Sequence, residues 1–120
     1  MSYVDGFVIA VPNANRDAFI AHAKRFDAIF LEYGATRVVE CWGDDVPDGK
    51  TTDFRRAVQA TQDESVVFSW IEWPDKAARD AGMKKFMADP RMEEASKCPF
   101  DGKRMIFGGF APVVTLGSSR

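Results

Sequence analysis

Residues 65–73 read SVVFSWIEW, and this stretch decides the fold. It is rich in Val, Phe, Ile and Trp, which favour strands because their side chains fit a pleated surface. Pro74 ends the run, since proline donates no ladder hydrogen bond, and Asp75 is expected to cap a following helix. Alternate side chains of a strand lie on opposite faces, and both sets are apolar here: Val66, Phe68 and Trp70 against Val67, Ile71 and Trp73. The run therefore predicts a central strand that is covered on both faces.

Upstream, the pattern predicts a strand followed by a long helix. Residues 3–12 are rich in Val and Ile and stop at a proline, as a strand before a break does. Asn13 and Asn15 can accept hydrogen bonds from the free amides of a helix start. Residues 16–33 carry one apolar stripe, and Gly34 suits the left-handed position that ends many helices. The stripe consists of Phe19, Ala23, Phe26, Phe30 and Tyr33.

Between this helix and the central strand, we expect a second strand, a loop and a short helix. Residues 35–42 contain the β-rich run RVVECW. Residues 43–53 hold several Asp and Gly, which is typical of a turn-rich loop. Residues 54–60 are expected to form a short helix capped by Thr52 or Asp53.

Downstream, residues 76–88 place Ala78, Gly82, Met83, Phe86 and Met87 on one broad apolar half of a helix. Residues 91–97 are expected to add one helical turn. Residues 104–116 predict a last strand in which Gly108 and Gly109 permit a bulge or a close backbone contact. Residues 117–120 are expected to fray as a tail.

This order of elements predicts an α+β fold of the ferredoxin-like βαββαβ type. Such a fold is a four-stranded antiparallel sheet with two helices on one face. The 120 residues fit one domain with one core, so residues 1–120 are expected to be a single domain. Because both faces of the central strand are apolar, we expect a second copy of the chain to cover the face opposite the helices.

Composition excludes several classes of protein. A formal net charge of -2 gives no positive field for phosphates, so nucleic acid is not an expected partner. No run approaches the roughly 18 apolar residues of a membrane span, and the first residues resemble a strand rather than an export signal. Cys41 and Cys98 lack the spacing of a zinc site or a disulfide framework. A cytoplasmic protein with reduced thiols is therefore expected.

Two carboxylates interleaved with two indoles are the first candidates for chemistry. Glu40 and Trp42 are expected on the same sheet face as Trp70 and Glu72. A carboxylate in an apolar cavity has a raised pKa and can act as a general base, so Glu40 and Glu72 are candidate catalytic residues beside Trp42 and Trp70 as ligand-binding residues. The alternative is that both carboxylates pair with Arg37, Lys103 or Arg104 across strands. The register is unknown, so whether Glu40 and Glu72 are neighbours stays open.

Other polar groups give weaker signals. Lys103 and Arg104 follow an Asp-Gly turn and are candidate ligands for an anion, although the turn alone explains them. His22, the only histidine, is expected to be structural or solvated. The Asp residues of the 43–53 loop do not match a calcium-binding loop. The sequence contains no P-loop or dinucleotide-binding fingerprint, and we predict neither a metal nor a cofactor.

Four stretches carry a resemblance to a known family: YVDGFV, RVVECWGDDVPDGK, VVFSWIEWPDKAARD and CPFDGKRMIFGGFAPVV. Together they resemble the bacterial YbaA-like family of unknown function over residues 3–114. The resemblance implies a homodimeric α/β barrel in which two ferredoxin-like sheets face each other. It implies no particular activity.

Two hypotheses for function follow. In the first, the chain is a small-molecule binder or a cofactor-independent enzyme that uses a cavity on the sheet; by analogy of fold alone, such barrels host oxygenases and isomerases without cofactors. In the second, it is a non-catalytic homodimeric interaction or stress-associated protein. A cavity below about 300 Å³ between the sheets, or one filled by Phe68, Trp42 and Trp70, favours the second hypothesis.

Overall fold

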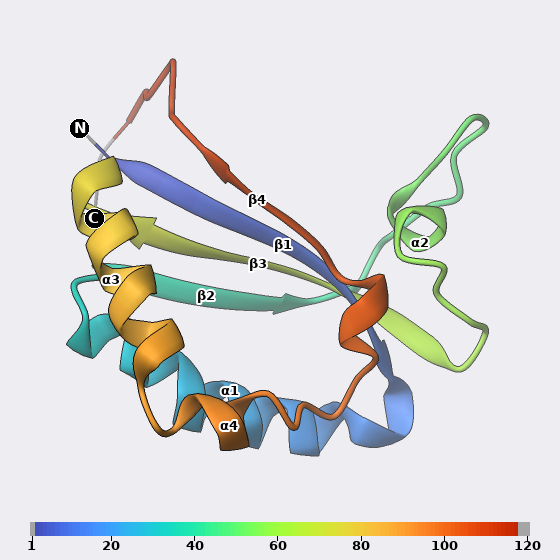
Figure 1. The fold of residues 1–120 in the computed structure, drawn as a ribbon. Coiled ribbons are helices and arrows are strands. Elements are labelled where there is room, and N and C mark those ends of the chain that lie inside the picture. Colours follow the sequence, from blue (N-terminus) through green and yellow to red (C-terminus); the bar gives the residue numbers. More distant parts are fainter. Residues whose placement is uncertain (1, 118–120) are drawn as a thin grey trace.

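The computed structural model describes residues 2–117. Its strands are β1 (Tyr3–Pro12), β2 (Arg37–Trp42), β3 (Glu64–Trp73) and β4 (Ile106–Phe110). Its helices are α1 (Arg16–Glu32), α2 (Phe54–Ala57), α3 (Lys76–Ala88) and α4 (Met92–Ala95), with 3-10 turns at Asn13–Asn15 and Gly102–Arg104 (Figure 1).

The described strands form one sheet in the order β2-β3-β1-β4, and every neighbouring pair is antiparallel. The two central strands, β1 and β3, pair along their whole length, from Tyr3 opposite Trp73 to Pro12 opposite Glu64. This topology confirms the predicted α+β, ferredoxin-like fold and the central position of β3.

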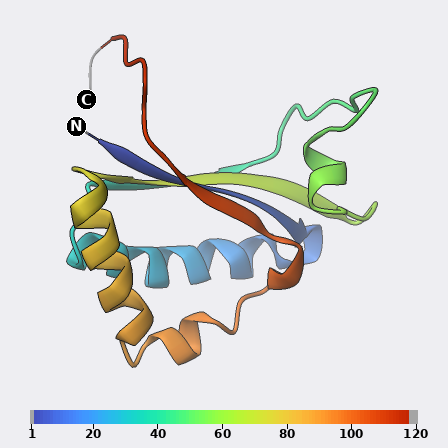
Figure 2. The same ribbon diagram turned by 45° about the horizontal axis from the view of Figure 1, so that its top comes forward.

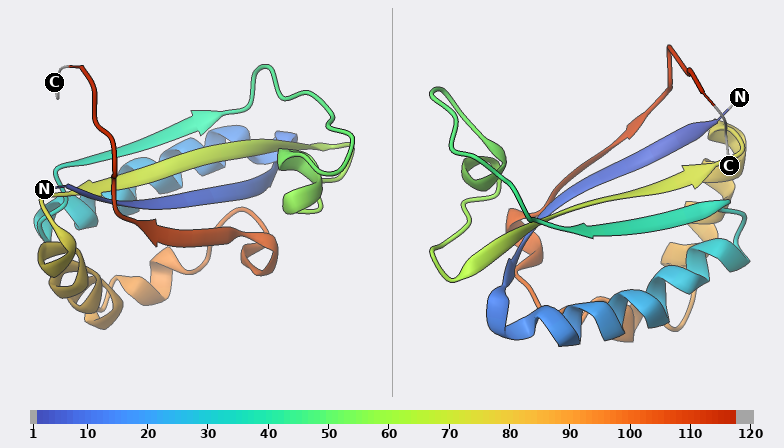
Figure 3. Two further views of the ribbon diagram at one scale, coloured as in Figure 1. Left: turned by 90° about the horizontal axis from the view of Figure 1, so that it is seen from above. Right: turned by 180° about the vertical axis from the view of Figure 1, so that it is seen from behind.

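Three helices cover one face of the sheet. Figure 2 shows α1, α3 and α4 on the same side, while α2 and residues 111–117 extend beyond the opposite side. Residues 111–117 lie near the start of β1, and α2 lies at the other end of the sheet (Figure 3). We call the side opposite α1 the open face.

The alternation of side chains divides the core between the two faces. On the helix side, Ile9 and Val67 pack against Phe19 of α1. On the open face, the fully buried Val58, the residue directly after α2, packs against Val8, Ala10 and Val66 at one end of the sheet. The rest of the open face remains exposed and apolar, with Phe68 at 46%, Ile106 at 45% and Phe110 at 62% of full exposure.

A buried carboxylate joins β1, β3 and α3. Asp5, only 3% exposed, accepts a hydrogen bond of 2.9 Å from Trp73 Nε1 and one of 2.8 Å from Arg79 Nη2. Gly82 lies where α3 crosses Trp73, and a Cβ there would sit 2.6 Å from the carbonyl oxygen of Tyr33. The position therefore requires a residue without a side chain.

Helix ends follow the predictions in part. Asp53 and Asp75 cap α2 and α3, accepting 2.7 Å bonds from Arg56 N and Ala78 N, and Gly34 has φ of 111° after α1. The prediction that asparagines cap α1 is wrong, because neither side chain caps it and Asn15 instead donates to the Pro99 carbonyl.

Two predicted elements are shorter than expected. The predicted helix 54–60 ends at Ala57. Two residues later, Gln59 has a positive φ of 52°, which a helix cannot include. The predicted strand 104–116 is confined to β4, and its register with β1 continues without a bulge through Gly108 and Gly109. A Cβ on Gly109 would lie 2.7 Å from Arg79 Nη2, so close packing explains this glycine. The predicted frayed tail begins at residue 117, and most of it lies outside the described residues.

Substituting Gly82→Ala is expected to lower the free energy of unfolding by about 1–3 kcal/mol, because the new methyl group overpacks Trp73 and the Tyr33 carbonyl. Gly102→Ala is the control, since nothing lies within 4 Å of a Cβ at that position. Urea unfolding of both variants measures the difference. Equal stability of the two variants would show that α3 does not depend on this close contact.

Candidate functional site

A cavity of about 570 Å³ lies between the sheet and its helices. The strands β1, β2 and β3 form its floor, and α1, α3, α4 and the segment leading into β4 form its walls. Its volume falls within the range of small-molecule sites. The cavity is thus on the helix side of the sheet.

The cavity walls are mainly aromatic and sulfur-containing. Methionine is flexible and polarisable, so a wall of methionines adapts to ligands of different shape. The apolar wall includes Phe7, Phe19, Phe26, Phe30, Phe86, Phe100, Phe107, Met83, Met87, Met92 and Met105.

Two carboxyl groups lie together on the wall between α1 and β2. Asp27 comes from α1 and Glu40 from β2, and both line the cavity. Burial, a hydrogen bond with Glu40 and the negative charge of Glu40 raise the pKa of Asp27 to about 9. The pair therefore keeps a proton at neutral pH, as neighbouring carboxyl groups in an apolar site do.

Glu40 also presents an unused acceptor. Its Oε1 atom is buried, and among residues 2–117 no N–H or hydroxyl group donates to it, so it depends on the proton that the pair shares. A buried acceptor without a donor is costly, so this atom is available for a donor on a ligand.

His22 and Cys98 line the same cavity. The Nε2 atom of His22 lies 2.8 Å from the carbonyl oxygen of Ala95, and its ring packs against Phe26 with centroids 4.7 Å apart. These contacts tie α1 to α4. The Sγ atom of Cys98 lies 3.5 Å from the Phe100 carbonyl oxygen, and both cysteines are free thiols.

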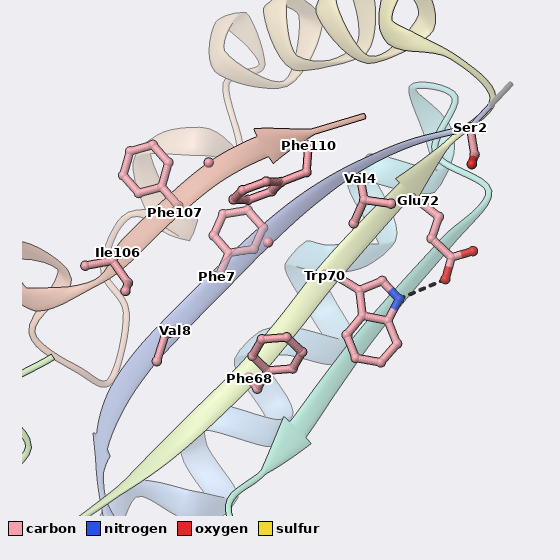
Figure 4. Close-up of a pocket in the computed structure, with 12 residues that line it drawn as sticks. Ser2, Val4, Phe7, Val8, Phe68, Trp70, Glu72, Ile106, Phe107 and Phe110 are labelled. Carbon is pink, nitrogen blue, oxygen red and sulfur yellow. Dashed lines mark hydrogen bonds between the residues drawn. The ribbon is translucent and has the colours of Figure 1, made fainter. Parts of the chain in front are cut away.

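The expectation that the four interleaved residues share one face is wrong. Glu40 pairs with Ser69 and Trp42 with Val67, so both side chains lie on the helix side with those residues. Trp70 and Glu72 lie on the open face, where Trp70 Nε1 donates a 2.8 Å bond to Glu72 Oε2 (Figure 4). Glu40 and Glu72 are therefore on opposite sides of the sheet.

The alternative role of the carboxylates holds for Glu72, which pairs with Arg37 at 3.7 Å. Trp42 lies at the rim of α1, where its ring is 6.1 Å from that of Phe19 and is covered by the Arg16 guanidinium at 5.4 Å. Trp42 is not among the residues that line the cavity, so its ring does not fill it.

Lys103 and Arg104 lie in the 3-10 turn before β4, away from the carboxyl pair. Arg104 donates two 2.7 Å bonds to Glu64 and one of 3.0 Å to Asp101. The hydrogen bonds from the Arg104 guanidinium hold the pKa of Glu64 down to about 2. Since Arg104 is committed to these carboxylates, anion binding by Lys103 and Arg104 stays a prediction that this geometry does not favour.

Asp27 was missed by the sequence reasoning. It lies four residues after Ala23 and three before Phe30, so it falls on the inward stripe of α1. An acidic residue on an apolar stripe was the signal that could have identified it.

Residues 2–117 contain no group of three or more His, Cys, Asp or Glu side chains placed to hold a metal ion. In the same part of the chain, no helix is both long and apolar enough to cross a membrane.

The family described as "Protein of unknown function (DUF1428)" matches residues 2–102. The chain belongs to the DUF1428 family. The uncharacterized protein YbaA of Escherichia coli strain K12 is similar to this DUF1428 chain. The two are 57% identical over 115 residues, which cover 95% of this chain and 98% of YbaA. YbaA of Shigella flexneri matches to the same extent. The predicted YbaA-like resemblance is confirmed.

Solved structures share the fold of this DUF1428 chain. SnoaB, a cofactor-independent oxygenase from Streptomyces nogalater, superposes with a TM-score of 0.64 at 16% identity, over 98% of both chains. A NIPSNAP domain protein from Burkholderia xenovorans gives 0.61 at 16% identity, over 97% of this chain and 99% of that one. A dimeric ferredoxin-like protein from an uncultured marine organism gives 0.57 at 10% identity, over 98% of both. At these identities the likeness shows the fold alone.

The raised pKa of Asp27 predicts how stability changes with pH. Between about pH 4 and pH 9, Asp27 holds a proton in the folded protein that the unfolded chain releases. The contribution of Asp27 to the free energy of unfolding therefore falls as pH rises, by at most about 1.4 kcal/mol per pH unit. Asp27→Asn removes that dependence.

Urea unfolding of wild type and Asp27→Asn at several pH values measures it, and the variant is expected to gain stability relative to wild type as pH rises. Asp17→Asn, which removes an exposed carboxylate from the same helix, is the control. A constant difference between Asp27→Asn and wild type would mean that Asp27 holds no proton in the folded protein.

Proposed function

We propose that the chain is a small-molecule binder or a cofactor-independent enzyme whose ligand lies in the cavity between the sheet and the helices. The observation that carries the proposal is an apolar cavity of about 570 Å³ with the Asp27 and Glu40 carboxyl pair on its wall. A pair that shares one proton near neutral pH can both donate and accept a proton.

The chemistry assigned to the pair is acid–base chemistry. Glu40 offers a buried oxygen to which no N–H or hydroxyl group of residues 2–117 donates, and Asp27 carries the proton that the pair shares. Both groups are half-buried against apolar neighbours, where a charge or hydrogen bond has a larger effect than in water. The name of SnoaB describes an oxygenase that needs no cofactor, which supports catalysis of that kind on this fold.

The volume of the cavity speaks against the non-catalytic alternative. It exceeds the roughly 300 Å³ below which a ligand site is not expected. Phe68 and Trp70, which would fill the cavity under the non-catalytic alternative, point from β3 to the open face (Figure 4).

The open face supports a homodimer. Side chains of β1, β3 and β4 form an apolar hollow on it that includes Val4, Val8, Phe68, Trp70, Ile106 and Phe110, of which Phe68, Ile106 and Phe110 are exposed (Figure 4). An apolar patch of this kind marks an interface. We propose that a second copy covers it, as the neighbour described as a dimeric ferredoxin-like protein supports.

The setting of this homodimer is also part of the proposal. Residues 1–120 act as one domain in the cytoplasm, where Cys41 and Cys98 stay reduced. The net charge of -2 supports a protein without a nucleic-acid partner.

Filling the cavity is expected to weaken ligand binding. Ala23 of α1 lines the cavity, and Ala23→Phe places a ring in it; Ala21→Phe, at an exposed position of the same helix, is the control. Binding of naphthylmethanol, followed by calorimetry, should be saturable in wild type and the control and about tenfold weaker in Ala23→Phe. Equal affinities, with both variants folded by circular dichroism, would place the ligand elsewhere.

Charging the open face is expected to separate the two copies. Sedimentation of wild type should give twice the 13.4 kDa mass of one chain, and Phe68→Lys should give one chain mass at micromolar concentration, because a buried unpaired charge opposes association. Leu31→Lys, at a half-exposed position of α1, is the control and should remain dimeric. A dimeric Phe68→Lys would show that the copies associate through another surface.

A further inference from the structure

A second hollow, of about 540 Å³, lies outside the cavity between α1 and the edge strand β2. Both hollows are lined by Phe19, Ala23, Asp27, Val38 and Glu40. These residues form the wall between the two spaces. Of these five residues, only Asp27 and Glu40 have polar side chains. The carboxyl pair is therefore the polar part of the wall that separates the cavity from the outer hollow.

On the cavity side, no positive charge of the described residues is free to neutralise the Asp27 and Glu40 carboxyl pair. Asp5 and Arg79, which also line the cavity, bind each other at 2.8 Å, and Arg79 additionally binds Asp80. The remaining titratable groups on the cavity wall are His22 and Cys98. On the outer side, Arg16 lies over the Trp42 ring and Lys24 is exposed. The described cavity wall therefore has a negative balance.

We infer that the cavity binds a protonated aromatic amine, whose ammonium group donates hydrogen bonds to Asp27 and Glu40 while its ring packs among the phenylalanines and methionines. The inference rests on the proposed function and names the ligand class of that same site.

Three features of the wall favour an amine over other ligands. The buried Oε1 atom of Glu40 needs a donor, which an ammonium N–H supplies and a carboxylate ligand does not. The negative balance attracts a cation and opposes an anion. The many aromatic rings of the wall interact favourably with a cation through their faces.

Binding releases one proton. In the free protein the pair shares a proton, because two buried carboxylates repel each other. When the ammonium group binds, the O–H bond of Asp27 breaks, the electron pair stays on the carboxylate oxygen, and the proton passes to water in the outer hollow. The ammonium then lies between two carboxylates, and no oxidation or reduction takes place.

The experiment compares three ligands that share one ring system: naphthylmethylamine, naphthylmethanol and naphthoate. Titration calorimetry in two buffers of different ionisation enthalpy gives the affinity and the number of protons released. Wild type is expected to bind the amine about tenfold or more tightly than the alcohol, and the naphthoate more weakly than both. Amine binding should release about one proton and strengthen as pH rises toward 8.

Variants test the residues. Glu40→Gln and Asp27→Asn should lose the proton release and the preference for the amine while still binding the alcohol. Asp17→Asn should behave as wild type. Alcohol binding in the variants shows that the cavity is intact, so a loss of amine preference is not a folding defect.

Each outcome has one meaning. If wild type binds the alcohol but shows neither preference for the amine nor proton release, the amine inference is overturned and the proposed cavity site stands. If wild type binds none of the three ligands, both are overturned. If Glu40→Gln and Asp27→Asn keep the preference and the proton release, the ammonium group does not bind the pair.

Discussion

The buried carboxylate of Asp5 is the contact on which the rest of the structure depends. A charge with 3% exposure is tolerated only because Trp73 and Arg79 both donate to it. These contacts fix the register of β1 against β3 and hold α3 at one end of the sheet. With α3 anchored there and Gly82 against Trp73, the middle of the helix side is left to α1, α4 and the cavity between them.

The fold was predictable because local and global signals agree. The apolar run of β3, the stripe of α1 and the aspartate before α3 each predict the element that forms. Prediction failed where packing decides the ends of elements. The strand after Arg104 pairs with β1 only from Ile106 opposite Val8 to Phe110 opposite Val4, close to the start of β1 at Tyr3, and no local pattern shows where this pairing ends.

The site was only half predictable, because the faces of two strands are related by their register. Alternation within β2 places Glu40 with Trp42, and alternation within β3 places Trp70 with Glu72, but the pairing of Glu40 with Ser69 puts the two sets on opposite sides. Glu40 was found because its residue type suggests chemistry. Asp27 was not, since its partner comes from a different element and meets it only in the folded chain.

The alternation of β3 also has an evolutionary consequence. Phe68 and Trp70 belong to the open face, while Ser69 and Ile71 belong to the cavity side, so adjacent codons specify the two faces of the sheet in turn. A point substitution at one set of positions changes one face of the sheet and leaves the other face unchanged. Insertion or deletion of a single codon within β3 exchanges both sets at once. One face can therefore change by substitution alone, whereas a change in the length of β3 alters both faces together.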